Sequence, residues 1–210
     1  GIKSSLLSAE DIKKLDTRVD FKRCGGCSLQ HMNYEATLRL KTKLVKDNIE
    51  RIGGLKDVTV FDTIGMENPF NYRNKAQYPV AVAKGEVISG FYAPRSHEVI
   101  KSEVCGIQNP ASDRLRNEII RFITEKGLTV YDESTGKGLV RHIVTRVGFN
   151  TGDVMVVIVI NGKRLPHADE LVNRLTQMDL GNGDVSSENA KSALQLKSIY
   201  LNINDKKTNV

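Results

Sequence analysis

The feature that most constrains this chain is a pair of cysteines separated by two glycines, Cys24-Gly25-Gly26-Cys27. Glycine tolerates the positive φ angles of a tight knuckle, so both thiolates can point at one metal ion. The third cysteine of the chain, Cys105, lies far along the sequence, just before a predicted helix. If Cys105 completes the site, the metal fastens the N-terminal segment to the middle of the fold.

The residue types around this pair leave several kinds of chemistry open. A zinc site would hold the three sulfurs together with His31 as a fourth, tetrahedral ligand. An iron–sulfur site would take three or four thiolates. A redox pair is disfavoured, because the residues before Cys24 are charged and form no apolar strand. In the alternative without a metal, Cys105 is a small buried hydrophobic residue.

Composition narrows the class of protein. With 210 residues, of which 40% are hydrophobic, the chain can bury the core of one large domain or two small ones. Its net charge of +6 favours a polyanionic partner such as RNA, DNA or an anionic membrane face. An odd number of cysteines argues against a secreted, disulfide-framed protein and favours the cytoplasm. Apolar runs fall well short of the roughly 20 residues that span a bilayer, so no membrane partner is expected.

Periodicity predicts an α+β domain with a mainly antiparallel sheet, flanking helices and the N-terminal cysteine knuckle. Helices are expected over residues 9–15, 34–52, 110–126 and 166–178. Strands are expected over residues 58–64, 72–80, 86–92, 128–131, 139–149, 154–160 and 198–204. Of these, 72–80 with 86–92 and 139–149 with 154–160 are expected to form hairpins. Residues 1–22 form an N-terminal strap and residues 23–210 the main domain, in which a division into two subregions would fall near residue 106.

Three of the predicted strands bear on function. Alternation along 72–80 places Arg73, Lys75 and Gln77 on one face, where long polar donors suit a phosphate backbone. In 139–149, Arg141 lies on one face and His142 on the other, together with Arg146. The strand 154–160 is apolar throughout and is expected to be buried on both faces.

Five side chains are the candidate RNA contacts. Each of them has an alternative role as a solvated charge or as a structural pair. For His142, a hydrogen-bonded structural role is an equally good interpretation. The five are Arg73, Lys75, Arg95, Arg141 and His142.

Several motifs together resemble the RNA (uracil-5-)-methyltransferase family, most closely its bacterial 23S ribosomal RNA branch. They are the segment from Cys24 to His31, Tyr34 with the lysine-rich helix that ends in Arg51-Ile52-Gly53-Gly54-Leu55, Asn68-Pro69-Phe70-Asn71-Tyr72-Arg73-Asn74-Lys75, Cys105-Gly106-Ile107-Gln108 and Leu139-Val140-Arg141-His142. The resemblance implies a central domain that helps to hold RNA, with no DNA partner expected, and that binds a [4Fe–4S] cluster through Cys24, Cys27 and Cys105. In the family this domain lies between a small barrel and a Rossmann-like domain, which binds S-adenosylmethionine and carries the catalytic cysteine.

The sequence departs from the family pattern at two places. The first of the family's four cluster cysteines would fall at Arg18. No cysteine follows Cys105, and no glycine-rich turn of the kind that holds adenosyl ligands is visible. Methylation at carbon 5 of uracil needs a nucleophilic thiolate, a base and a methyl donor. We therefore expect a fragment without catalytic or adenosyl-binding residues, whose parent is an S-adenosylmethionine-dependent methyltransferase of 23S rRNA. A stand-alone, zinc-structured RNA-binding module is the alternative.

Overall fold

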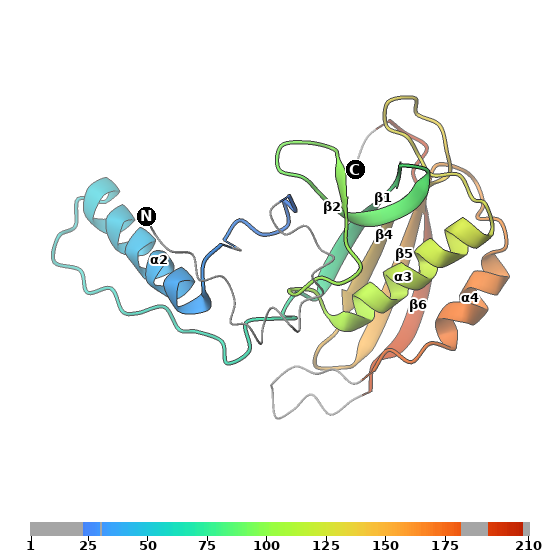
Figure 1. Ribbon diagram of the computed structural model, residues 1–210. Coiled ribbons are helices and arrows are strands. Elements are labelled where there is room, and N and C mark those ends of the chain that lie inside the picture. The colour runs from blue at the N-terminus through green and yellow to red at the C-terminus, as the bar shows by residue number, and fades with distance from the viewer. Residues whose placement is uncertain (1–22, 30, 182–192, 208–210) are drawn as a thin grey trace.

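A six-stranded sheet with the strand order β3-β2-β1-β4-β5-β6 forms the body of the molecule, and a helical arm extends away from it (Figure 1). The computed structural model describes residues 23–29, 31–181 and 193–207. The predicted helix 9–15, the strap 1–22 and most of the predicted loop 179–193 lie outside these residues. In the described part, no helix has the length and apolar character needed to cross a membrane.

The arm begins with helix α2, Tyr34–Asp47, which continues as a π-helical turn, η1, Asn48–Ile52. The Asn33 side chain caps the helix by accepting a hydrogen bond from the backbone N–H of Ala36 at 2.8 Å. Gly53 follows the last turn. The prediction of a helix over residues 34–52 is therefore confirmed.

The predicted strand 58–64 is wrong, because this segment has no strand beside it to complete a ladder. It runs back as an extended chain along α2. The backbone N–H of Thr63 donates to Thr42 Oγ1 at 2.9 Å, and the N–H of Met66 donates to Tyr34 Oη at 2.6 Å. Side chains of the helix therefore supply the hydrogen bonds that a neighbouring strand would have given.

Strands β1, Lys75–Ala83, and β2, Glu86–Tyr92, form the predicted hairpin. Its turn consists of Lys84 and Gly85, whose φ angles of 51° and 81° are those of a tight two-residue connection. A short strand β3, Val99–Lys101, pairs with β2 at the edge of the sheet.

The second predicted hairpin is also present, as β4, Val140–Val147, and β5, Asp153–Ile160. Strand β4 additionally pairs with β1, which joins the two hairpins into one sheet. Strand β6, Gln195–Ile203, pairs with β5 in parallel, so the sheet is mixed rather than wholly antiparallel. The predicted strand 128–131 is reduced to one bridge between Val130 and Val140.

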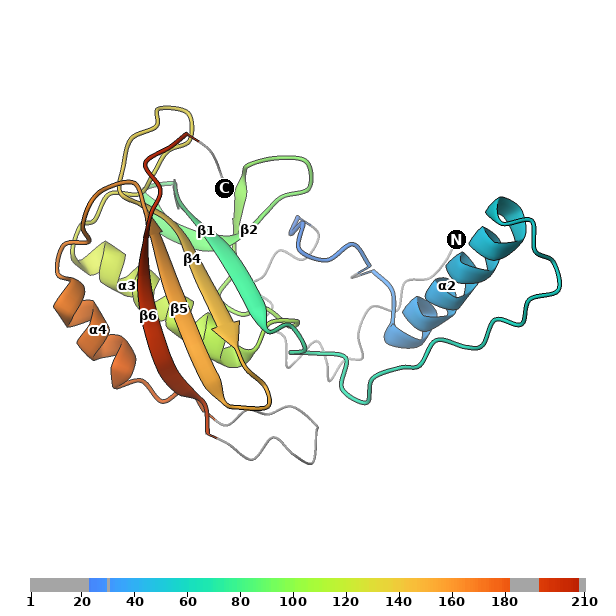
Figure 2. The same ribbon diagram turned by 180° about the vertical axis from the view of Figure 1, so that it is seen from behind.

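Two helices lie on one side of this sheet: α3, Pro110–Glu125, and α4, Ala168–Thr176. Helix α3 crosses in front of the strands in Figure 1 and behind them in Figure 2. The apolar core lies between sheet and helices, and its members on α3 include Leu115, Ile119 and Phe122, each fully buried.

The expectation that β5 is buried on both faces is wrong. Val154, Val156, Ile158 and Ile160 face the helices and are buried, whereas the alternate residues 155, 157 and 159 are partly exposed. Among the described residues no helix covers the second side of the sheet, which is the side seen in Figure 2.

Candidate functional site

The cysteine knuckle is docked on the end of β2. The backbone N–H of Gly25 donates to the carbonyl oxygen of Tyr92 at 2.9 Å. A Cβ atom at position 25 would lie 2.6 Å from that oxygen, and one at position 26 would lie 3.6 Å from the ring of Phe91. The first glycine is therefore required by the close approach of two backbones, in addition to any demand of the cysteines.

Cys105 lies in the loop between β3 and α3. Its backbone N–H donates to Asp113 Oδ2 at 2.8 Å, which ties the loop to the first turn of the helix. On the other side, the N–H of Asn71 donates to the carbonyl of Gly106, and the N–H of Arg73 to that of Ile107, both at 2.9 Å. The loop is thus fixed by backbone contacts on two sides.

The Cys105 thiol is close enough to the knuckle to be influenced by it. Burial raises the pKa of Cys105 to about 11, and the Asp113 carboxylate and the Cys27 thiol raise it further, while hydrogen bonds from the backbones of Ile107 and Gln108 lower it. At neutral pH the side chain is therefore a protonated thiol.

The donor set does not fit the cluster that the resemblance implies. A [4Fe–4S] cluster takes four thiolates, and the whole chain has three cysteines. In the described ranges, no three Cys, His, Asp or Glu side chains are arranged to hold a metal ion. His31, the possible fourth zinc ligand, is exposed, and position 18 lies outside the described residues. Metal binding by Cys24, Cys27 and Cys105 stays a prediction, to be checked by metal analysis and an absorption spectrum.

A buried network of Asp113, Tyr78 and Arg116 holds the Cys105 loop through the bond from the Cys105 backbone to Asp113. Both Tyr78 Oη and Arg116 Nη2 lie 3.2 Å from Asp113 Oδ1, and the Arg116 guanidinium stacks over the Tyr78 ring at 4.7 Å from its centre. Burial raises the pKa of Asp113, while Arg116 opposes the shift. Sequence reasoning missed this network. Its one signal was a carboxylate and a guanidinium three residues apart on a helix face that also carries leucine and isoleucine.

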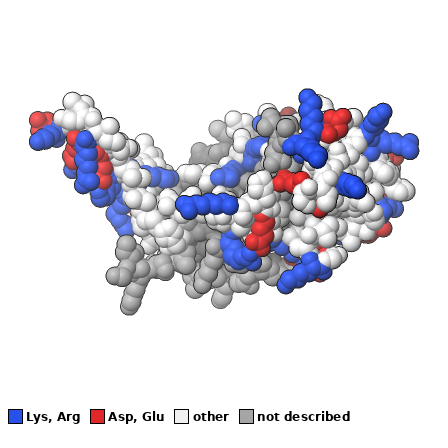
Figure 3. All heavy atoms as spheres, turned by 90° about the horizontal axis from the view of Figure 1, so that it is seen from above, with Lys and Arg blue, Asp and Glu red and all other residues white. Residues whose placement is uncertain are grey.

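The predicted RNA-binding residues separate into an exposed and a buried group. Arg73 and Lys75 are exposed at the start of β1, and Arg95 is exposed in the loop after β2 with a φ angle of 58°. Figure 3 shows lysine and arginine side chains spread over both arm and body.

Arg141 and His142 are buried instead, with 3% and 7% of their surfaces exposed. Arg141 Nη1 donates to the carbonyl oxygens of Asn204 at 2.9 Å and Lys206 at 2.7 Å, and its guanidinium stacks on Tyr131. Burial lowers the pKa of His142, and the neighbouring Arg141 lowers it further. The two side chains are therefore buried within the fold, whereas Arg73 and Lys75 are exposed, and RNA contact by Arg141 and His142 stays a prediction.

A polar cluster that sequence reasoning missed links two loops beside the knuckle. Tyr92 Oη donates to Glu133 Oε1 at 3.3 Å, and His97 Nδ1 lies 2.6 Å from Glu133 Oε2. Burial, and then the Glu133 carboxylate, raise the pKa of Tyr92 to about 12. The cluster connects the loop after β2 to the loop before β4.

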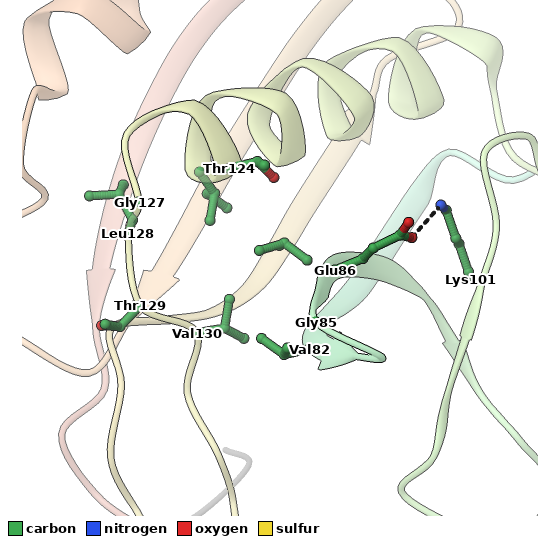
Figure 4. Close-up of a pocket in the computed structure, with 11 residues that line it drawn as sticks. Val82, Gly85, Glu86, Lys101, Thr124, Gly127, Leu128, Thr129 and Val130 are labelled. Carbon is green, nitrogen blue, oxygen red and sulfur yellow. Dashed lines mark hydrogen bonds and ion pairs between the residues drawn. The ribbon is translucent and has the colours of Figure 1, made fainter.

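A groove lies elsewhere, between the β1–β2 turn and the end of α3. It has a volume of about 760 Å³ (Figure 4). Its charged lining residues, Lys101 and Glu86, pair with each other at 3.1 Å, and the rest of the lining is mainly aliphatic or backbone. This groove offers no nucleophile beside a base.

The chain is similar in sequence to proteins of several bacteria. It is 44% identical over 190 residues to a protein of Halalkalibacterium halodurans, 45% identical over 186 residues to one of Caldanaerobacter subterraneus, and 44% identical over 190 residues to one of Clostridium tetani. All three are named as uncharacterized RNA methyltransferases. The chain is a relative of the RNA methyltransferases. No protein-family model matches it.

The relationship covers only part of each RNA methyltransferase. The alignments include 89% or 90% of this chain but 38% of each relative. Among solved structures, the Pyrococcus abyssi tRNA (uracil-54, C5)-methyltransferase in complex with S-adenosyl-L-homocysteine has a similar fold, with a TM-score of 0.61 at 24% identity. That similarity covers 90% of this chain and 38% of the solved one, and it supports the fold described above.

Proposed function

We propose that this chain is the RNA-binding central part of an S-adenosylmethionine-dependent RNA (uracil-5-)-methyltransferase that acts on 23S rRNA. The observation that carries the proposal is the 44% identity, along 90% of the chain, with a protein named as an RNA methyltransferase. The solved uracil-54 methyltransferase with a similar fold supports the uracil-5 chemistry. The choice of 23S rRNA rests on the resemblance of the cysteine and Tyr72-Arg73-Asn74-Lys75 motifs.

The described residues are suited to binding rather than to methyl transfer. A nucleophile for carbon 6 of uracil must be an accessible thiolate. Cys105 is a poor candidate, because its pKa is raised to about 11 and its loop is held by backbone hydrogen bonds on two sides. We assign the chemistry to the part of such an enzyme that lies outside the 38% matched by this chain.

The test compares binding with turnover. The 210-residue chain is mixed with labelled S-adenosylmethionine and a 23S rRNA transcript, and methyl incorporation and RNA binding are both measured. We expect RNA binding that weakens as salt is added, because the cations of the chain neutralise phosphates. We expect no methyl incorporation, because the methyl-donor site is assigned to another part of the enzyme. Methyl transfer by this chain, or a lack of RNA binding even at low salt, would contradict the proposal.

A further inference from the structure

The side of the sheet opposite α3 and α4 carries a set of side chains that we call the open face. It consists of alternate residues of β1, β4, β5 and β6, and Figure 2 shows these four strands side by side. The register places them in three rows: Lys75, Arg146, Met155 and Ser198; Gln77, Val144, Val157 and Tyr200; Pro79, His142, Val159 and Asn202.

The first row contains two cations directly opposite each other. Lys75 on β1 pairs with Arg146 on β4, and both side chains are exposed. Like charges at opposite positions destabilise a sheet. Lys75 Nζ donates to Gln77 Oε1 at 3.1 Å, and no ion pair joins Lys75 or Arg146 to a described carboxylate. Arg73, two residues before Lys75 along the chain, is likewise exposed and has no ion pair in the described part.

Cations on the helix side of the sheet behave differently. Lys101 pairs with Glu86, Arg121 with Glu118, and Arg174 with Glu125 and Glu170. The four strands β1, β4, β5 and β6 contain one acidic residue, Asp153, at the first position of β5, and it forms no ion pair with Lys75 or Arg146. The open face therefore has unneutralised positive charge of the kind that a bound anion would balance.

The second row supplies an uncharged surface next to these cations. Val144 and Val157 are partly exposed in the middle of the sheet, and Tyr200 is 56% exposed on the edge strand. Exposed aromatic rings on a sheet are stacking platforms for the bases of single-stranded nucleic acid, while cations beside them hold the backbone. A covering protein domain would instead have to bury Lys75 and Arg146 against carboxylates of its own.

We propose that the open face binds a single-stranded segment of RNA, with one backbone phosphate at Lys75, a second at Arg146 and a base on Tyr200. This inference rests on the proposed function, because it assigns the RNA surface of the same chain. It replaces the predicted contacts of the buried Arg141 and His142 with the exposed Arg146 and Tyr200.

The test measures how tightly the full 210-residue chain binds a fluorescein-labelled oligouridylate, by fluorescence anisotropy over a range of salt concentrations. The test variant is Lys75→Gln with Arg146→Gln. The matched control is Lys101→Gln with Arg121→Gln, which removes the same charge from the helix side. For the test variant we expect the slope of log affinity against log salt to become shallower by about 1.4, at about 0.7 per phosphate contact on a single strand. The slope of the control variant should differ from the wild-type slope by less than about 0.7, the change expected from one lost phosphate contact.

Two further variants make the result specific. Tyr200→Ala should weaken oligouridylate binding about five-fold or more, without changing the salt slope, because it removes stacking and no charge. Lys75→Arg with Arg146→Lys keeps both charges and should bind like wild type. Unlabelled double-stranded RNA should compete less well than oligouridylate, since paired bases cannot stack on Tyr200.

The outcomes separate this inference from the proposed function. If wild-type chain binds oligouridylate but the test variant and Tyr200→Ala match the control, the open face is not the RNA surface and covers another domain instead. If wild-type chain binds no RNA even at low salt, the proposed function itself fails. Thermal unfolding checks the fold: the Gln variant should unfold at the wild-type temperature or above it, because a repulsive pair has been removed.

Discussion

Replacing Asp113 by asparagine should destabilise the protein more than any surface substitution. The two carboxylate oxygens accept hydrogen bonds from the Tyr78 hydroxyl and the Cys105 backbone N–H, and Arg116 lies 3.2 Å from Oδ1. Asparagine has one acceptor oxygen, so its NH₂ group must face one of these donors. The Arg116 side chain is 1% exposed and would lose its counter-charge.

The magnitude follows from this geometry. Removing one partner of a buried ion pair costs about 3–5 kcal/mol, because the remaining charge stays desolvated. For a chain of this size, about 3 kcal/mol corresponds to a fall of roughly 6–12 °C in the unfolding temperature. Urea unfolding followed by circular dichroism measures the loss. Asp169→Asn, in the exposed first turn of α4, is the control and should change the free energy of unfolding by about 0.5 kcal/mol or less.

A second variant tests the reasoning itself. Combining Asp113→Asn with Arg116→Met removes the charge that was left unpaired, so the double variant should be more stable than Asp113→Asn alone. If Asp113→Asn stays within about 1 kcal/mol of wild type, or if Arg116→Met makes it worse, the charge pair is not what holds the Cys105 loop on α3.

Two other predictions concern the sheet and its loops. Burial lowers the pKa of His142 below its ordinary 6.5. The neutral imidazole therefore contributes its full stabilisation of the fold above pH 6.5, and this stabilisation is lost as the pH falls through the lowered pKa of the folded protein. Urea midpoints at about pH 7.5 and about pH 5.5 should therefore differ more in wild type than in His142→Gln, and equal differences would refute this assignment. Gly138→Ala would place a Cβ 2.0 Å from the carbonyl oxygen of Val130, whereas Gly85→Ala meets nothing within 4 Å. Both glycines have positive φ, so the first should cost about 2 kcal/mol more than the second in thermal unfolding, and equal costs would contradict the clash.

The elements with strong local signals could be predicted from the sequence. Helices α2 and α3 begin at Tyr34 and Pro110, the predicted first residues, and each is capped by the asparagine before it. The two-residue turn at Lys84-Gly85 defines a hairpin by its own geometry. The alternation of β1 correctly placed Arg73, Lys75 and Gln77 opposite the buried Ala76 and Tyr78.

The errors depend on tertiary contacts. Residues 58–64 alternate like a strand, but the side chains of α2 take up their hydrogen bonds. The apolar run of β5 reads as buried on both sides, although helices cover one side alone in the described part. The burial of Arg141 could not be foreseen either, because nothing near it in the sequence indicates that the carbonyls of Asn204 and Lys206 accept its hydrogen bonds.

The bonds from Arg141 to Asn204 and Lys206 span 63 and 65 positions of the chain. The contacts within the β4–β5 hairpin are local, so it can form early. The Arg141 guanidinium, however, must stay hydrated until β6 and the residues after it supply the carbonyl acceptors. We therefore expect the β4–β5 hairpin to reach its final packing only when β6 docks beside it. On a translating ribosome, this sheet would reach its native packing after residue 206 has left the exit tunnel, so a nascent chain arrested before that point should still be open to proteases at β4.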